Sequence, residues 1–584
     1  MNYSKMVILS LVLFLSLGVG FKQICRPPPK KLFSSPKLTD IIMSDCSYEL
    51  KDSENKKELQ SNPLLANNGL PQFENIKVEH IEPAISYLVK QLQQDFIQLE
   101  KDIQQIVADT NLYQLIFVER EKINHPLEYA WGIVSHLQSV NNSPELRQVY
   151  EQLLPSLIQQ NSYMSQSKIL FNGLKRLRSN PDPDFIGPTV QRILDDELQG
   201  MTLSGIDLSE NKQQQFNQLK EQLSQLSTQF SNNLLDSVKQ FSWIVTEKEE
   251  IEGLPASAWE LYSQQALEQH PESTPEKGPW KITLDIPSYL PIMQQVKSSQ
   301  TREYLYRQFI IRGSTDGYDN LSLMKQILEL KQQKATILGF GSYAELSLSQ
   351  KMARNQTQVH QLLDQIFEQA HPIAIKDLEK LQQLARKELN DDNYILQPWD
   401  TAYYAERLKE QHLNFKQEDL KPYLSFEQVV SGLFDLAQNL FGITITEVDK
   451  KVEGIHVWDP DVRYYRIFNQ HQLDEPIASF YLDPFSRPAN KKGGAWMNGC
   501  QDKSEVLYHL PIAYLICNGS PPIYEGNLLV RPSLMTFDEV ETLFHEFGHG
   551  LQHMLTEVSQ DTWIYFPWDM EMKPAPTISE RTQK

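Results

Sequence analysis

Apolar residues recur at spacings of three and four along most of the chain, which predicts a protein built mainly from helices. The pattern dominates residues 78–192, where Asn- and Pro-containing breaks separate its segments. A Gln-rich stretch at 212–241 continues the pattern with Phe216, Leu219, Leu223, Leu226 and Phe230. Spacings that alternate between three and four are typical of a long helix that packs lengthwise against another helix.

The pattern changes after Gly442 to short runs that either alternate with period two or are almost continuously apolar. The runs span residues 463–468, 477–483 and 507–517. Runs of this length and pattern predict β-strands. We therefore expect a small β-sheet directly before the last helical segment of the chain.

That last helix is predicted to begin after Thr536. Thr536 and Glu539 have the spacing of a capping box, in which each side chain accepts a hydrogen bond from the other residue's backbone N–H. The apolar positions of the segment are Val540, Leu543, Phe544, Phe547, Leu551, Met554 and Leu555. Together these features predict a helix with one buried face.

The same segment contains the motif His545-Glu546-Phe-Gly-His549. Two histidines four residues apart lie on one face of a helix, so their imidazoles can bind one Zn²⁺. Glu546 can take a proton from a zinc-bound water and pass it to a leaving amine. The motif therefore predicts metal-assisted amide hydrolysis. The alternative is an amphipathic helix with ordinary surface histidines, which the capping box and the apolar face disfavour.

The residues that follow His549 restrict the type of zinc site. Gln552 and Leu555 occupy the positions at which the metzincin motif has Gly and His, which excludes that type. A thermolysin-like arrangement with a downstream Glu as third ligand is left. His553 lies two turns from His545, about 12 Å along the helix axis. We interpret His553 as a helix-surface residue or one that contacts the site from outside.

Composition narrows the possible partners. A chain of 584 residues is expected to form two or more domains. Its formal net charge of -20 argues against nucleic acid and against anionic membranes as partners. Cys500 and Cys517 are isolated in the sequence, and the other two cysteines lie near the N-terminus. Neither a disulfide scaffold nor a thiolate metal site is predicted.

The N-terminus has the composition of a targeting segment. Residues 6–21 are uncharged and largely apolar, like the core of a signal peptide, and residues 22–37 are basic without acidic residues, like a transit peptide. The combination resembles the bipartite leaders of complex plastids and predicts delivery to an organelle. The alternative is a cytosolic protein whose translation starts at Met43. We divide the chain into a leader (1–43), a disordered linker (44–70), an N-terminal helical region (71–245) and a catalytic region (246–584).

Several separated stretches resemble the oligopeptidase A and thimet oligopeptidase family of zinc peptidases, and they keep the order of that family. They are Asn62-Pro-Leu-Leu, Val78-Glu-His-Ile, Leu284-Asp-Ile-Pro-Ser-Tyr-Leu-Pro, Leu338-Gly-Phe-Gly-Ser-Tyr, Pro398-Trp-Asp-x-Ala-Tyr-Tyr, Phe480-Tyr-Leu-Asp, Gly493-Gly-Ala-Trp-Met and Leu543-Phe-His-Glu-Phe-Gly-His-Gly-Leu-x-His. The resemblance implies a mainly α, neurolysin-like fold. Its expected features are a two-lobed helical body, a deep channel for short unstructured peptides, and a small β-sheet beside the zinc helix.

By the same resemblance, His545 and His549 bind one zinc ion and Glu546 is the general base. The family's third ligand, a Glu followed by Leu or Ala and then Pro-Ser-Gln, has no clear counterpart here, and Glu571 is the nearest candidate. We therefore expect the catalytic region to be C-terminally incomplete. The alternative function is a peptide-binding variant with impaired catalysis or none.

Substrate contacts are expected at the predicted sheet, because a sheet edge can bind an extended peptide through main-chain hydrogen bonds. Gly493 and Gly494, with Lys491 and Lys492, predict a flexible loop that is either a hinge over the cleft or an ordinary hairpin loop. Gly493, Gly494 and Tyr514 are the candidate substrate-binding residues. We expect a monomer that binds short peptides and has no stable membrane association.

Overall fold

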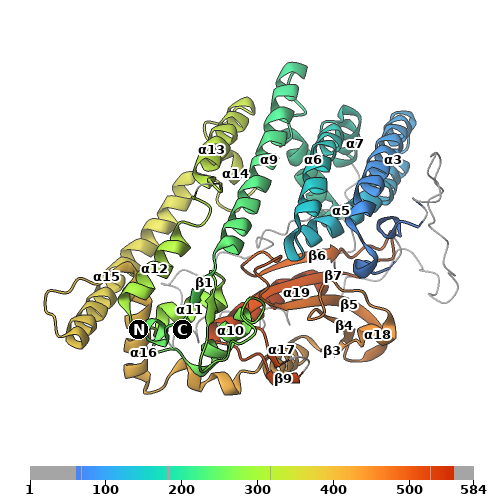
Figure 1. The fold of residues 1–584 in the computed structure, drawn as a ribbon. Helices are drawn as coiled ribbons and strands as arrows, with labels where there is room; N and C mark the ends of the chain where they lie inside the picture. The colour runs from blue at the N-terminus through green and yellow to red at the C-terminus, as the bar shows by residue number, and fades with distance from the viewer. Residues whose placement is uncertain are drawn as a thin grey trace, which may run out of the picture.

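The computed structural model describes Leu59 and residues 61–66, 69–180, 185–315, 317–525 and 528–557. The predicted leader and most of the predicted linker lie outside these residues, as does Glu571. Figure 1 shows long helices that stand side by side above a small β-sheet. The prediction of a mainly α fold, with a small sheet beside the helix that carries the two histidines, is confirmed.

The first half of the described chain is helical. Its helices are α3 (Val78–Gln105), α4 (Asp109–Tyr113), α5 (Arg120–Val140), α6 (Pro144–Ser165), α7 (Lys168–Arg178), α8 (Pro188–Leu203) and α9 (Glu210–Gln240), and a π-helical segment (Gln114–Glu119) joins α4 to α5. The predicted long helix at 212–241 corresponds to α9, which packs against α6 and α13 (Asn320–Ile337).

The second half combines helices with all of the strands. Its other helices are α10 (Ala256–Ala266), α11 (Ile286–Gln295), α12 (Ser299–Ile310), α14 (Tyr343–Leu348), α15 (Gln356–Leu389), α16 (Thr401–Leu413), α17 (Phe426–Phe441), α18 (Lys450–Glu453) and α19 (Phe537–Met554). Two short pairs of strands are β1 (Trp243–Val245) with β2 (Trp280–Ile282) and β8 (Ile523–Glu525) with β9 (Leu528–Arg531). In the described residues, no helix is both long enough and apolar enough to span a bilayer.

The main sheet has five strands in the order β3-β4-β5-β7-β6. They are β3 (Ile443–Glu447), β4 (Arg463–Asn469), β5 (Gln472–Phe485), β6 (Trp496–Gln501) and β7 (Ile512–Gly519). β5 and β7 are parallel, and the other neighbours are antiparallel. β6 therefore lies at one edge of the sheet.

One predicted strand begins later than its apolar run suggested. The run at 507–517 predicted a strand from Leu507, but β7 begins at Ile512. The residues before it form a turn closed by a bridge between Ser504 and His509, with Tyr508 at a φ of 56°. A left-handed residue cannot continue a strand, so backbone geometry shortened the strand although the apolar run continues.

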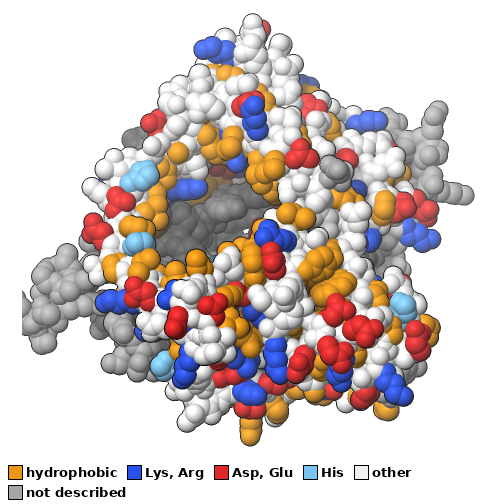
Figure 2. Space-filling model, turned by 60° about the vertical axis from the view of Figure 1, so that its left-hand side comes forward, with side chains coloured by type: hydrophobic (Ala, Val, Ile, Leu, Met, Phe, Trp, Pro, Cys, Tyr) orange, Lys and Arg blue, Asp and Glu red, His pale blue; other side chains and the backbone are white. Residues whose placement is uncertain are grey.

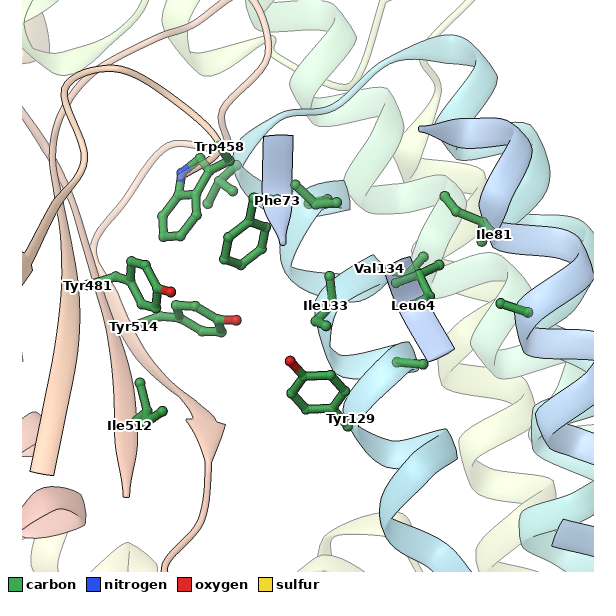
Figure 3. Packing of buried hydrophobic residues seen from close by; sticks show 14 of the residues in the cluster. Leu64, Phe73, Ile81, Tyr129, Ile133, Val134, Trp458, Tyr481, Ile512 and Tyr514 are labelled. Carbon is green, nitrogen blue, oxygen red and sulfur yellow. The ribbon is translucent and has the colours of Figure 1, made fainter. Parts of the chain in front are cut away.

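The main sheet is covered on both faces, and successive residues of β7 alternate between the two. Ile512, Tyr514 and Ile516 face a core shared with α3, α5 and α6, while Ala513, Leu515 and Cys517 face a core shared with α17 and α19. Figure 3 shows the first of these cores, where Tyr481 and Tyr514 of the sheet point toward Phe73, Trp458 and the side chains of α5. The N-terminal helices thus share a core with the sheet.

A buried carboxylate holds the end of β5 in place. Asp483 is fully buried and accepts hydrogen bonds from Lys491 Nζ (2.8 Å), from Arg487 Nη1 (2.8 Å) and Nη2 (2.7 Å), and from Trp458 Nε1 (2.8 Å). Burial acts to raise the pKa of Asp483, but the hydrogen bonds and charges of Arg487 and Lys491 outweigh it and hold the pKa below its usual value. The carboxylate is therefore ionised at neutral pH.

Asp483→Ala is expected to lower the free energy of unfolding by about 3–5 kcal/mol, because it leaves the buried Lys491 ammonium without its counter-charge. Asp377→Ala is the matched control, since its pair with Lys380 is more than half exposed on both sides, and its effect should stay within about 1 kcal/mol. Urea unfolding followed by circular dichroism measures both.

The pH dependence of this difference follows from the lowered pKa of Asp483. The contribution is fully present above the unfolded-state pKa of about 3.9 and is lost as the pH falls through the lower folded-state value. The two proteins should therefore converge in stability toward acid pH. Equal unfolding midpoints for Asp483→Ala and Asp377→Ala at neutral pH would contradict the assigned role of the carboxylate.

Candidate active site

The N-terminal end of α19 is fixed by the predicted capping box. The Thr536 hydroxyl accepts a hydrogen bond from Glu539 N (3.2 Å), and Glu539 Oε2 accepts one from Thr536 N (2.6 Å). Glu539 Oε1 also accepts hydrogen bonds from the backbone N (2.8 Å) and the hydroxyl (3.0 Å) of Ser520. One carboxylate therefore both caps the helix and ties it to the residue that follows β7.

The middle of α19 lies very close to β7. A Cβ added at Gly550 would stand 2.9 Å from Cδ2 of Leu515, a side chain with no exposed area. Leu543 and Phe547 are each 2% exposed and pack in the same core. Because Gly550 has no Cβ, α19 can pack closely against Leu515 of the sheet.

His545 and His549 converge on a single point. Their Nε2 atoms are 3.1 Å apart, and their ring planes are inclined by 82°. His545 is exposed and His549 is half-buried, so the site opens to solvent. Two nitrogen ligands of one zinc ion each lie about 2.0–2.1 Å from the metal, so they can be at most roughly 4 Å apart. The observed separation fits a shared metal ion.

Glu546 is buried on the same helix. Its side chain is 9% exposed, whereas the neighbouring His545 is exposed. Burial raises the pKa of the Cys517 thiol on β7 to about 12, and the negative charge of Glu546 acts in the same direction. The Glu546 carboxylate is therefore close enough to the end of β7 to act on Cys517 electrostatically.

The described residues bring two imidazoles together at this point that could bind one metal ion. Among residues 59–557 with the gaps given above, no group of three or more His, Cys, Asp or Glu side chains could hold a metal ion. Glu571, the candidate third ligand, lies outside the described residues. The donor set seen here, two imidazoles beside a carboxylate, fits zinc but is one ligand short of a complete protein site.

His553 is turned toward β6 rather than toward the other histidines. Its Nε2 lies 3.1 Å from the carbonyl oxygen of Gln501, the last residue of that strand. Its Nδ1 lies 3.6 Å from a carboxylate oxygen of Asp502. These contacts agree with the interpretation of His553 as a residue outside the metal site.

Gly493 and Gly494 are both exposed and lie three and two residues before β6, respectively. Gly494 has a φ of 95°, which a residue with a Cβ rarely adopts. Asn518 donates hydrogen bonds to the carbonyls of Lys492 (2.9 Å) and Gly494 (2.5 Å). These two bonds hold the glycine loop against the end of β7.

Lys491, which the sequence pattern places in a flexible loop, is a buried residue. It is 1% exposed, and its ammonium donates to the carbonyls of Phe485 (2.8 Å) and Cys517 (2.5 Å) as well as to Asp483. The pattern Lys-Lys-Gly-Gly is typical of solvated loops, and no sequence signal distinguishes the buried lysine from its neighbour. Three residues help to position the site: Lys491, Asn518 and Glu539. Of these, only Glu539 could be found from the sequence, because it has the spacing of a capping box with Thr536.

Tyr514 is not brought together with the histidines. It is 2% exposed and faces the core on the side of the sheet opposite α19, as Figure 3 shows. Its ring stacks on His136 with the ring centroids 3.7 Å apart. Burial lowers the pKa of His136 to about 3, so the stacked imidazole is neutral. Tyr514 therefore packs in the core against His136, away from the histidine pair of α19.

Two convergent imidazoles and a carboxylate on one helix, packed beside the edge of a small sheet, define the class of metallopeptidases that carry a His-Glu-x-x-His motif. The chain belongs to peptidase family M3, whose model matches residues 292–574, and the N-terminal domain model of neurolysin and thimet oligopeptidase matches residues 85–213. The predicted family is confirmed.

Curated relatives include organellar and cytosolic enzymes. The chain is 39% identical to the chloroplastic and mitochondrial organellar oligopeptidase A of Arabidopsis thaliana over 85% of its own length and 62% of that protein. It is 36% identical to oligopeptidase A of Escherichia coli, over 85% of this chain and 71% of that one. Among solved structures, PZ peptidase A has a TM-score of 0.43 at 13% identity, covering 80% of this chain and 62% of that one.

His545→Ala or His549→Ala should reduce bound zinc to background, because each removes one of the two nitrogen ligands of the described site. The two imidazoles of the described residues by themselves should hold zinc weakly and substoichiometrically, because they are fewer ligands than a zinc site normally has. Equilibrium dialysis followed by metal analysis measures this.

His553→Ala is the matched control for metal binding, since His553 lies on the same helix and its ring contacts Gln501 and Asp502 instead. It should leave the zinc content unchanged. Tightly held zinc at one ion per chain would contradict a two-ligand site and would favour an additional acidic ligand such as Glu571.

Proposed function

We propose that this chain is a zinc-dependent metalloendopeptidase that hydrolyses short unstructured peptides. The observation that carries the proposal is the convergence of His545 and His549 to 3.1 Å beside the buried carboxylate of Glu546. Membership of peptidase family M3 supports the same reaction class.

His545 and His549 would hold the metal. Zinc, when bound, supplies Lewis-acid chemistry, lowering the pKa of water and polarising the peptide carbonyl. Glu546 is the general base: its carboxylate accepts the proton of the attacking water and returns it to the leaving nitrogen. Its low exposure keeps bulk water from competing for that proton. A third ligand from outside the described residues, with Glu571 as candidate, would complete the site.

The peptide is proposed to bind along β6. As the edge strand of the sheet, β6 pairs with β7 on one side only. An extended peptide can add to such an edge through main-chain hydrogen bonds, which give affinity with little dependence on side chains. The exposed Gly493 and Gly494 in the loop before β6 leave room for a peptide backbone to approach.

The shape of the molecule supports a preference for short chains. Figure 2 shows a hollow on one face whose rim is bordered by hydrophobic side chains. An extended peptide can enter such a hollow, whereas a folded protein would have to unfold before it could present a bare strand there. The proposed substrates are therefore short and unstructured.

A peptide-binding protein with impaired catalysis is the second candidate. The observation that favours it is the pair of metal ligands, which is one short of the usual three in the described residues. Peptide binding along β6 does not require the metal, so the two candidates differ only in turnover.

The leader is proposed to direct the protein to an organelle such as a plastid. The Arabidopsis thaliana relatives include an organellar oligopeptidase A and a protein named probable cytosolic oligopeptidase A. N-terminal sequencing of the mature protein should find residues 1–20 removed. A mature chain that starts at Met43 or Ser44 would contradict the leader and favour internal initiation in the cytosol.

Glu546→Gln should lower the rate of peptide hydrolysis by about 10² to 10⁴ or more. The amide keeps the shape of the side chain but can neither accept the proton of the water nor return it. Bound zinc should be unchanged, which separates the base from the ligands. Turnover of a short quenched fluorescent peptide and metal analysis on the same sample measure the two effects.

Glu541→Gln is the matched control, because Glu541 lies on the same helix but is exposed, and its turnover should equal that of the unchanged chain. A folded protein should not be cut. If the unchanged chain bound the peptide without turnover, the second candidate would hold; if Glu546→Gln turned over normally, the assigned base would be wrong.

A further inference from the structure

We propose that His553 is a positioning residue that fixes the edge strand β6 relative to the metal-binding histidines and thereby sets where a bound peptide lies. This inference rests on the proposed peptide-binding function of β6. It assigns a role to a histidine that is neither a metal ligand nor the general base.

The contacts of His553 reach the C-terminal end of β6 from the last turn of α19. A carbonyl oxygen only accepts hydrogen bonds, so His553 Nε2 carries the proton that it donates to Gln501 at 3.1 Å. Nδ1 then faces the Asp502 carboxylate at 3.6 Å. The ring also lies against the strand, since a Cβ added at Gly499 would stand 3.5 Å from His553 Cε1.

A second link runs between the same two segments. Lys503 Nζ donates a hydrogen bond to the backbone carbonyl of Thr556 at 3.1 Å. The cationic side chain thus meets the C-terminal end of α19, where the helix dipole is negative. At the opposite end of the helix, Glu539 is bonded to Ser520. α19 is therefore tied to the β6 segment at one end and to the end of β7 at the other.

β6 depends on such links more than an internal strand does. It has one neighbour, β7, and its pairing with β7 is irregular between Gly499 and Gln501. An irregularity of this kind bends a strand and re-aims its residues. The ladder to β7 alone therefore leaves the end of β6 weakly fixed, and His553 contacts it at this irregular point.

The consequence concerns peptide affinity. A peptide that adds to β6 needs the N–H and C=O groups of that strand at fixed positions, and its scissile bond must then fall beside His545 and His549. Because His553 is on the same helix as those residues, it couples the strand to them directly. Each main-chain hydrogen bond that a displaced strand can no longer make to the peptide weakens the peptide affinity by up to about tenfold.

The test uses the full chain with zinc in a Glu546→Gln background, in which a labelled short peptide is bound without being cut. His553→Ala added to this parent should raise the peptide Kd by about tenfold to a hundredfold, as expected for the loss of one or two main-chain hydrogen bonds, with zinc content unchanged. His553→Gln should stay near the parent, because its amide can donate from a similar position. Gln552→Ala, an exposed neighbour, should have no effect.

In the chain that retains Glu546, His553→Ala should raise KM more than it lowers kcat, a split that general destabilisation would not produce. If His553→Ala does not fold, Lys503→Ala should shift the peptide Kd in the same direction by a smaller factor. A parent that binds no peptide would overturn the proposed function and this inference together. A parent that binds peptide as tightly as its His553→Ala or Lys503→Ala variants would overturn this inference alone.

Discussion

The buried carboxylate of Asp483 is the constraint on which the rest of the site depends. Ionised groups are costly to bury, and this one is held by Lys491, Arg487 and Trp458. The Lys491 ammonium also binds the carbonyl of Cys517 in β7, and Arg487 reaches the carbonyl of Val140 at the end of α5. A single charge cluster thus joins the N-terminal helices, the end of β5 and the strand beneath α19.

This junction determines what lies beside the histidine pair. β7 presents alternate residues to two cores, so Cys517 faces α19 while Tyr514 faces the N-terminal helices. Asn518 in the same strand bonds to the glycine loop, and Ser520, which directly follows the strand, bonds to the capping carboxylate of the helix. The proposed metal ligands, the proposed general base and the proposed peptide-binding edge all lie on elements that pack against β7, so small shifts of this strand would disturb all three.

The proposed metal binding and the proposed peptide binding rest on separate parts of this framework. In these proposals, zinc affinity depends on the number of ligands around His545 and His549, whereas peptide affinity depends on the free edge of β6. The chain spans about 62% of the length of the organellar relative and 71% of the Escherichia coli one. The two proposed functions, peptidase and peptide-binding protein, therefore share one binding surface and differ in how completely the metal is held.

The sequence by itself determined the helical fold, the capped helix and the positions of His545, Glu546 and His549, because helix periodicity, capping and i, i+4 spacing are local properties. It could not reveal that Lys491 is buried, that Tyr514 faces away from α19, or that His553 bonds to Gln501. Those outcomes depend on which residues distant in the sequence meet, since burial and partners follow from the packing of strands and helices. Only the tertiary structure decided them.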